Sequence, residues 1–218
     1  MMKEMKKLIV VLAVALMAGV QAHAQFMPDA GYIHAFENAK VTRNGSTYSG
    51  KDALDGFYLG GKFRIRLEGL AEGLSLDPGV NFSFLFGRDA GIEDIVDHAS
   101  QSEVALNIPV HVNYVFELAD GLGLQAYVGP TFQYGILFNA INGTTNPTNI
   151  YNYYKDVPGE NIPARKPANL FLGAGVGIEV AEMVNVMVGF DFGLMNQSSG
   201  ATNSIYRNQL KVGVGYIF

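Results

Sequence analysis

The stretch that decides the fold is Ile205–Phe218, IYRNQLKVGVGYIF. Read with a period of two residues, one face carries Tyr206, Asn208, Leu210, Val212, Val214, Tyr216 and Phe218. The other face carries Arg207, Gln209, Lys211, Gly213, Gly215 and Ile217. This alternation predicts a strand with one apolar side and one polar or small side. Because chain ends normally fray in water, an aromatic-ended strand is typical of a sheet that closes on itself.

Seven further stretches show strand character, and together with the last one they predict eight strands. They are Ala30–Ala39, Leu54–Glu68, Leu74–Gly87, Ser102–Glu117, Leu122–Phe138, Ala168–Val180 and Met183–Asn196. The first alternates poorly, so the direction in which its side chains point stays open. Most of the others reach the roughly 9–11 residues that a tilted membrane-spanning strand needs.

The connections between these strands alternate in length. Those at Gly69–Gly73, Leu118–Gly121 and Ala181–Glu182 are short, and those at Lys40–Ala53, Arg88–Gln101, Asn139–Pro167 and Gln197–Ser204 are longer. An up-and-down membrane barrel sorts its connections in this way, with short periplasmic turns and long outer loops. An even number of strands then places both termini in the periplasm.

The N-terminus is predicted to be a cleaved signal peptide, residues 1–24, followed by one barrel domain, residues 25–218. Lys3, Lys6 and Lys7 precede the apolar run Leu8–Val20, and Ala22-His23-Ala24 is a small-x-small cleavage site. The apolar run has 13 residues, too few for a helix that crosses about 30 Å of hydrocarbon. A mature membrane protein of this sequence must therefore be a barrel.

The amino-acid composition excludes some kinds of chemistry and of binding partner. The chain has no Cys, so disulfides and thiol chemistry are excluded. Its net charge of −5 without basic runs argues against nucleic acid. Charged residues make up 16%, below the roughly 25% of soluble domains, which favours a membrane protein.

A lipocalin-like soluble barrel is the alternative, because alternation alone does not say whether the apolar face contacts lipid or a core. The polar faces are rich in Gly, which suits a crowded narrow lumen. Aromatic residues gather near strand ends, as in the interfacial belts of membrane barrels. These positions include Phe57, Phe86, Phe116, Tyr134, Phe138, Tyr206, Tyr216 and Phe218. These features favour the membrane barrel.

Three stretches resemble strands of the small porin-family outer-membrane barrels. They are DPGVNFS at Asp77–Ser83, IPVHVNY at Ile108–Tyr114 and YVGPTFQYG at Tyr127–Gly135. The resemblance implies an eight-stranded Gram-negative outer-membrane barrel, related in shape to the OmpA and OmpX barrels, without implying one activity. The ending also resembles the closing strand of such barrels, in which Tyr216 and Phe218 would belong to the signal read by the barrel-assembly machinery. Because Pro109 and Pro130 cannot donate to a ladder, we expect bulges there.

Strand parity predicts an inward-facing charge network. Its proposed core consists of Lys62, Arg64, Arg66, Asp77, Asp191 and Lys211, with Glu103, Glu117 and Glu179 also pointing inward. Because unpaired charges in a narrow lumen are costly, we expect Asp191 to pair with Lys211 across strands, and Asp77 with Arg64 or Arg66. With Tyr127 and Gln133, these pairs are predicted to plug the lumen; singly hydrated charges in a wet pore are the alternative.

No catalytic residue, metal site or cofactor is predicted. His34, His98 and His111 lack the spacing of metal ligands. Asp97-His98, with Ser100 and Ser102 nearby, could seed a barrel-embedded hydrolase, but a solvated loop explains them more simply.

The connection Asn139–Pro167 is the candidate recognition loop, because long loops in compact folds usually have a function. It is rich in Asn and contains Tyr151, Tyr153 and Tyr154, residue types that serve adaptable contact surfaces. An idle solvated loop is the alternative.

The sequence therefore predicts a monomeric outer-membrane barrel with a plugged lumen and a structural or interaction role, surrounded by membrane lipid and lipopolysaccharide. An eight-stranded lumen is about filled by its side chains, which favours the structural or interaction role. A narrow channel for ions or small solutes is the first alternative.

Overall fold

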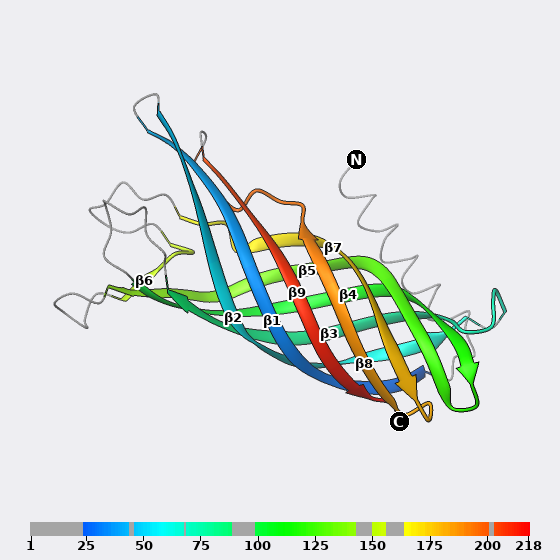
Figure 1. The fold of residues 1–218 in the computed structure, drawn as a ribbon. Coiled ribbons are helices and arrows are strands. Elements are labelled where there is room, and N and C mark those ends of the chain that lie inside the picture. The colour runs from blue at the N-terminus through cyan, green and yellow to red at the C-terminus, as the bar shows by residue number, and fades with distance from the viewer. Residues whose placement is uncertain are drawn as a thin grey trace, which may run out of the picture.

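The computed structural model describes residues 24–43, 46–67, 69–88, 99–142, 150–155, 164–200 and 203–218. Its strands are β1 (Ala24–Arg43), β2 (Ser46–Arg66), β3 (Leu74–Arg88), β4 (Ala99–Ala119), β5 (Leu122–Asn142), β6 (Ile150–Asn152), β7 (Ala168–Val180), β8 (Val184–Gly193) and β9 (Ser204–Tyr216) (Figure 1). The predicted signal peptide lies almost wholly outside the described residues. Within them, no helix has the length and apolar character needed to cross a membrane.

Eight of the strands form a closed antiparallel ring, which confirms the predicted fold class. β1 pairs with both β2 and β9, and β4 pairs with β5, so the ring has no free edge along the barrel wall. The short strand β6 was not predicted. It pairs with the far end of β5, through Asn139 and Asn152 among others, and lies outside the ring.

The two ends of the barrel differ. The turn end carries the start of β1, the C-terminus and the short connections, and the Phe218 amide donates to the Phe26 carbonyl there at 3.0 Å. The opposite end, called the loop end, carries the longer connections and the β1–β2 ribbon, which projects beyond the wall (Figure 1).

The prediction of a long loop at Lys40–Ala53 is wrong, because β1 and β2 stay paired as far as Arg43 and Ser46. The neighbouring strands stop earlier. β9 pairs with β1 up to Lys40, and β3 pairs with β2 up to Leu54. The segment is therefore a two-stranded ribbon that rises beyond the barrel wall.

The bulges predicted at Pro109 and Pro130 are also absent. Pro109 faces Thr131 and Pro130 faces Leu172 without a change of register on either side. The missing N–H interrupts the ladder locally but adds no residue. Register shifts between β4 and β5 lie instead between Val104 and Ala105, where β5 contributes the extra residue Ile136, and between Glu117 and Ala119, where β4 contributes Leu118.

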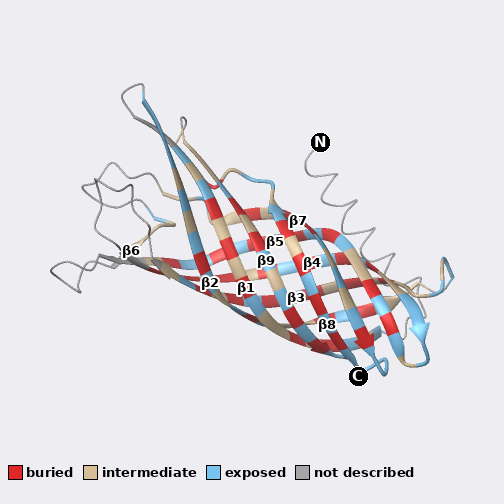
Figure 2. Ribbon diagram, in the orientation of Figure 1, coloured by how far each residue is buried: buried red, intermediate tan, exposed pale blue. Residues whose placement is uncertain are grey.

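The two faces of the wall have opposite character. Buried and exposed residues alternate along the ring strands (Figure 2), and the exposed ones are mainly Val, Leu, Ile, Phe and Tyr. The buried ones are largely polar, including Arg207, Gln209 and Asp191 at 0–1% exposure. A barrel that is apolar outside and polar inside is suited to lipid, because its outer surface needs no water.

The alternation of β1 is weak because apolar side chains lie on both of its faces. Ile33 and Ala35 point into the lumen, where they pack with Leu54, Leu85 and Phe138. The lumen thus contains one apolar layer among polar ones. Apolar residues on both faces of β1 hide the period of two that identified the other strands.

Glycines in the lumen make room for inward-pointing tyrosines. A Cβ on Gly189 would collide with the Tyr127 hydroxyl, and a Cβ on Gly213 would collide with the Tyr58 hydroxyl. We therefore expect Gly189→Ala to destabilise the barrel by about 1–3 kcal/mol through overpacking. Denaturant unfolding in detergent micelles measures this change. Gly50→Ala is the control, because a Cβ there meets nothing within 4 Å, and an equal loss for both variants would contradict the steric account.

Candidate functional site

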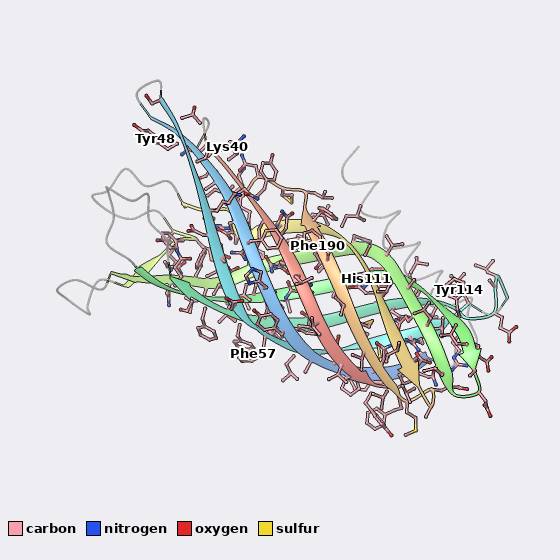
Figure 3. All side chains as sticks on the ribbon, viewed as in Figure 1. Lys40, Tyr48, Phe57, His111, Tyr114 and Phe190 are labelled. Atoms are coloured by element: carbon pink, nitrogen blue, oxygen red, sulfur yellow. The ribbon has the colours of Figure 1, made fainter. Side chains whose placement is uncertain are left out.

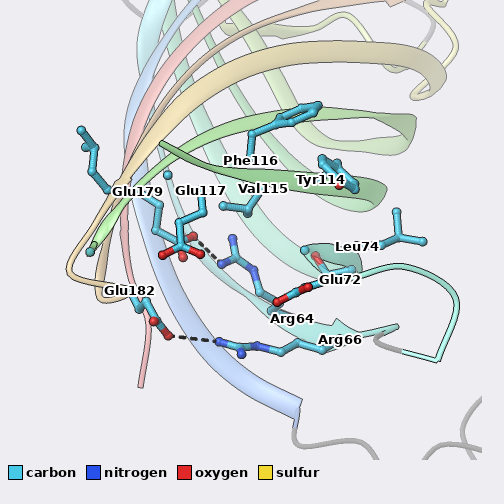
Figure 4. Close-up of a pocket in the computed structure, with 15 residues that line it drawn as sticks. Arg64, Arg66, Glu72, Leu74, Tyr114, Val115, Phe116, Glu117, Glu179 and Glu182 are labelled. Carbon is cyan, nitrogen blue, oxygen red and sulfur yellow. Dashed lines mark hydrogen bonds and ion pairs between the residues drawn. The ribbon is translucent and has the colours of Figure 1, made fainter. Parts of the chain in front are cut away.

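An open cavity of about 780 Å³ occupies the turn end of the lumen (Figure 4). Its charged walls comprise Arg64, Arg66, Glu72, Glu117, Glu179 and Glu182. Glu117, predicted to point inward, lies here at the exposed rim. The cavity is thus a wide entrance to the lumen with charged walls.

The inner end of this cavity is closed by Arg64. Its Nη1 donates to Glu179 Oε2 at 2.5 Å, and its Nε lies 3.7 Å from Asp77 Oδ2. The structure therefore brings Asp77 beside Arg64, one of the two predicted partners. Arg66 sits nearer the rim, with its Nη2 3.6 Å from Glu182 Oε2, and does not join Asp77.

Two ion pairs face each other at the waist of the lumen. Lys211 Nζ lies 2.5 Å from Asp191 Oδ2, and Lys62 Nζ lies 3.1 Å from Asp29 Oδ2. Both carboxylates are almost fully buried, so each needs its lysine. A cavity of about 30 Å³ remains between them, which is room for about one water.

The Asp191–Lys211 pair joins diagonal neighbours on β8 and β9. Asp191 lies directly opposite Gln209, and Lys211 lies opposite Gly189. The predicted pairing of Asp191 with Lys211 is present in the structure, but the register differs by two residues from the predicted one. A lysine is long enough to span a diagonal neighbour on one face of a sheet.

Amide and hydroxyl side chains fill the next layer toward the loop end. Asn107 Nδ2 donates to Ser83 Oγ at 3.0 Å, and Gln133 Nε2 donates to Asn107 Oδ1 at 2.9 Å. Below them, the His111 ring stacks on Tyr127 with centroids 4.7 Å apart. Predicted lumen residues Tyr127 and Gln133 thus both help to fill the cross-section.

A dense ion network closes the loop end. Arg207, fully buried, donates to Glu37 Oε1 at 2.6 Å through Nε and to both Glu103 oxygens at 2.5 and 2.7 Å. Arg165 also binds Glu37, at 2.5 and 2.8 Å, and donates to Gln197 Oε1 at 2.7 Å. Two arginines and two glutamates form a neutral cluster in which bidentate contacts satisfy each charge.

Part of the predicted recognition loop is packed into this mouth. Tyr154 donates to Glu103 Oε1 at 2.8 Å, and the rings of Tyr153 and Tyr154 lie 5.0 and 5.9 Å from that of Phe138. Tyr153 and Tyr154 are therefore lumen contacts rather than freely displayed side chains. Tyr151 lies in β6, and its side chain is outside the described set.

Sequence reasoning missed the centre of this network. Arg207 shares a face with Lys211 in the last strand, so parity alone could have placed it inward. Glu37 belongs to β1, whose alternation is obscured by Ile33 and Ala35. Arg165 comes from an irregular segment, for which no periodic signal exists.

No group of three or more His, Asp or Glu side chains in the described part of the chain could hold a metal ion. Asp97 and His98, the residues of the hydrolase alternative, lie outside the described residues. The chemistry on view is charge pairing and hydrogen bonding across a narrow polar lumen.

A closed antiparallel ring with an apolar outer wall and a polar, filled interior defines an integral membrane β-barrel. The family model described as "Outer membrane protein beta-barrel domain" matches residues 8–218. The chain therefore belongs to this family and is an integral outer-membrane β-barrel protein, as its resemblance to small porin-family barrels had implied.

Solved structures of similar fold include Neisserial surface protein A, at 12% identity and a TM-score of 0.45, with 88% of this chain and 97% of that chain covered. OprG from Pseudomonas aeruginosa is 11% identical with a TM-score of 0.47, covering 90% and 97%. Ail of Yersinia pestis, solved with a heparin analogue, is 12% identical with a TM-score of 0.34, covering 88% and 99%. A search of curated protein sequences gave no match.

Proposed function

We propose that the protein is a closed, monomeric barrel that displays its loop end outside the cell, with both termini in the periplasm. The loop-end ion network carries the proposal. Arg207, Glu37, Glu103 and Arg165 cross the mouth from β9, β1, β4 and the segment before β7. An open channel would need these charges to separate.

The packing below the mouth supports the same function. The apolar layer around Ile33, Leu54 and Phe138 offers no path for a hydrated ion, because it has no polar group to replace water. The turn-end cavity is therefore closed at its inner end and does not continue through the barrel. The exposed β1–β2 ribbon is a surface available to an extracellular ligand.

Planar bilayers test this function directly. Purified protein is expected to show no unitary conductance, because the lumen is blocked at the waist, at the apolar layer and at the mouth. Clear unitary currents from the wild-type chain would favour the narrow-channel alternative instead. Arg66→Met is a useful control, because its charge lies at the wide rim and its loss should leave conductance unchanged.

The C-terminus is proposed to be read by the barrel-assembly machinery. Tyr216 and Phe218 point outward at the turn end, with ring centroids 4.8 Å apart and Phe218 72% exposed. We expect deletion of Phe218 to lower outer-membrane yield several-fold, while the purified variant still refolds in detergent. Deletion of Lys155, an exposed residue outside the strands at the loop end, is the control, and equal yields would argue against a terminal signal.

A further inference from the structure

One polar cluster interrupts the apolar outer face of β1 and β2. The outward residues of these strands, from the turn-end rim upward, are mainly apolar: Phe26, Pro28, Ala30 and Phe36 on β1, and Phe63, Gly61, Leu59, Phe57 and Ala53 on β2. Tyr32, His34 and Asp55 are the exceptions. Their placement on the outer face puts them on the surface that meets lipid.

The three side chains form one hydrogen-bonded unit. The Tyr32 hydroxyl donates to Asp55 Oδ1, and His34 Nδ1 lies 2.7 Å from the same oxygen. His34 and Asp55 are directly opposite each other in the β1–β2 register. Facing a carboxylate, Nδ1 carries the imidazole proton, which leaves Nε2 and the second carboxylate oxygen for another partner. The side chain of Asp55 is 57% exposed, so that oxygen is accessible.

The unit lies near the loop-end border of the membrane. Eight residues separate Phe26, in the turn-end aromatic rim, from His34, and a strand tilted by about 40° rises roughly 20 Å over that length. The apolar band of such barrels is about 25 Å tall. A carboxylate at this depth meets the junction between acyl chains and head groups, and ionisable groups in contact with the membrane commonly mark functional sites.

Two lysines continue the same face beyond this border. Lys51 is opposite Asn38 and Lys40 is opposite Ser49, so the two lysines are diagonal neighbours (Figure 3 labels Lys40 on the ribbon). Both are exposed, and neither forms an ion pair with a described residue. Neighbouring like charges on a sheet repel, and an anion between them would relieve this repulsion.

We propose that Tyr32, His34, Asp55, Lys40 and Lys51 form a binding site for a phosphorylated glycolipid of the outer leaflet, and we name it the β1–β2 lipid site. Asp55 accepts hydrogen bonds from a hydroxyl or amide N–H where the sugar meets the acyl chains. The lysines bind phosphates on the sugar, about 13 Å (Lys51) and 20 Å (Lys40) farther along the strands. This assignment rests on the proposed orientation, which puts the loop end in the leaflet that contains such lipids.

The site recognises a hydroxyl or amide donor at the acyl junction and a phosphate farther out. Common phospholipids do not combine these two features. A phosphatidylglycerol head group offers a phosphate but no amide N–H at the acyl junction. A dephosphorylated glycolipid offers the hydroxyl and amide donors but nothing for the lysines. Glycolipid with phosphates should therefore bind more tightly than either.

Nanodiscs test this specificity with the full mature chain. Three compositions are used: phosphatidylglycerol with phosphatidylcholine, the same with lipopolysaccharide, and the same with dephosphorylated lipopolysaccharide. Lipid that remains bound after detergent extraction is measured by native mass spectrometry. Because both leaflets are accessible in a nanodisc, the outcome does not depend on orientation in the cell, nor on whether the lumen conducts.

The variants separate the two halves of the site. Lys40→Gln with Lys51→Gln should lower retention of lipopolysaccharide about tenfold and leave the dephosphorylated lipid unaffected. Asp55→Asn should lower retention of both glycolipids several-fold. Lys155→Gln with Lys166→Gln is the matched control, since it removes two exposed charges on the other side of the loop end. Heat-dependent gel mobility confirms that each variant is folded.

Equal retention of lipopolysaccharide by the Lys40/Lys51 variant and the Lys155/Lys166 control would overturn the site. So would retention of phosphatidylglycerol as strong as that of lipopolysaccharide. If inorganic phosphate alone displaced the glycolipid completely, the lysines would be a general phosphate site, and the lipid assignment would also be wrong.

Discussion

Arg207→Met is expected to destabilise the barrel by about 3–5 kcal/mol, because it leaves buried carboxylates without their main cation. Arg207 has no exposed surface and contacts Glu37 and Glu103 at 2.5–2.7 Å. Met is similar in length and apolar, so the change removes charge with little change in packing. The free energy of unfolding can be measured by urea titration in vesicles, with tyrosine fluorescence as the signal because the chain has no Trp.

A second substitution shows whether the loss comes from charge. Among the described residues, Glu103 keeps only the Tyr154 hydroxyl when Arg207 is gone, so Arg207→Met with Glu103→Gln should recover much of the stability. Arg66→Met is the control, with a 3.6 Å contact to a Glu182 side chain that is 74% exposed; it should cost about 0–1 kcal/mol. Equal losses for Arg207→Met and Arg66→Met would mean that the mouth is hydrated and the network is not buried.

The sequence predicts the barrel because its signal is periodic and repeated. β8 alternates Val184, Val186 and Val188 with Asn185, Met187 and Gly189, and each residue faces the side that its parity requires. The waist pair follows from the same parity and from the position of the β8–β9 loop. Only its register differs, because residue 191 lies opposite Gln209 rather than Lys211 and the pair is therefore diagonal.

A local sequence pattern between β1 and β2 favours a hairpin. Asn44-Gly45 is a preferred two-residue hairpin connection, and it lies midway between the stretches that became the β1–β2 ribbon. The polar composition of this region concealed its strands, because beyond the membrane both faces meet water and period-two alternation disappears.

The loop-end network could not be predicted, for a different reason. Arg165 and Glu37 are 128 residues apart, and Arg165 lies outside the ring strands. Parity places side chains only where the backbone is regular, so an irregular segment gives no indication of where its arginine points. The closed mouth, which carries the proposed function, therefore became visible only in three dimensions.

Asp191→Asn is expected to have an effect as large as that of Arg207→Met, about 3–5 kcal/mol of lost stability. The side chain of Asp191 is 1% exposed and lies 2.5 Å from Lys211. The substitution keeps the shape of the side chain but leaves the ammonium of Lys211 uncompensated. The ammonium of Lys62, the second lysine at the waist, adds to the repulsion on Lys211. Its own partner, Asp29, is already paired.

Asp191→Asn with Lys211→Met should recover much of the loss, because it removes both charges of the pair together. Urea titration of the single and double variants, with Lys211→Met alone to complete the cycle, measures the coupling between the two residues. A harmless single change would mean that water reaches Lys211, whose side chain is 16% exposed, and screens it. Unitary currents from Asp191→Asn without loss of stability would then identify the waist as part of a wet pore, and the plugged lumen would be wrong.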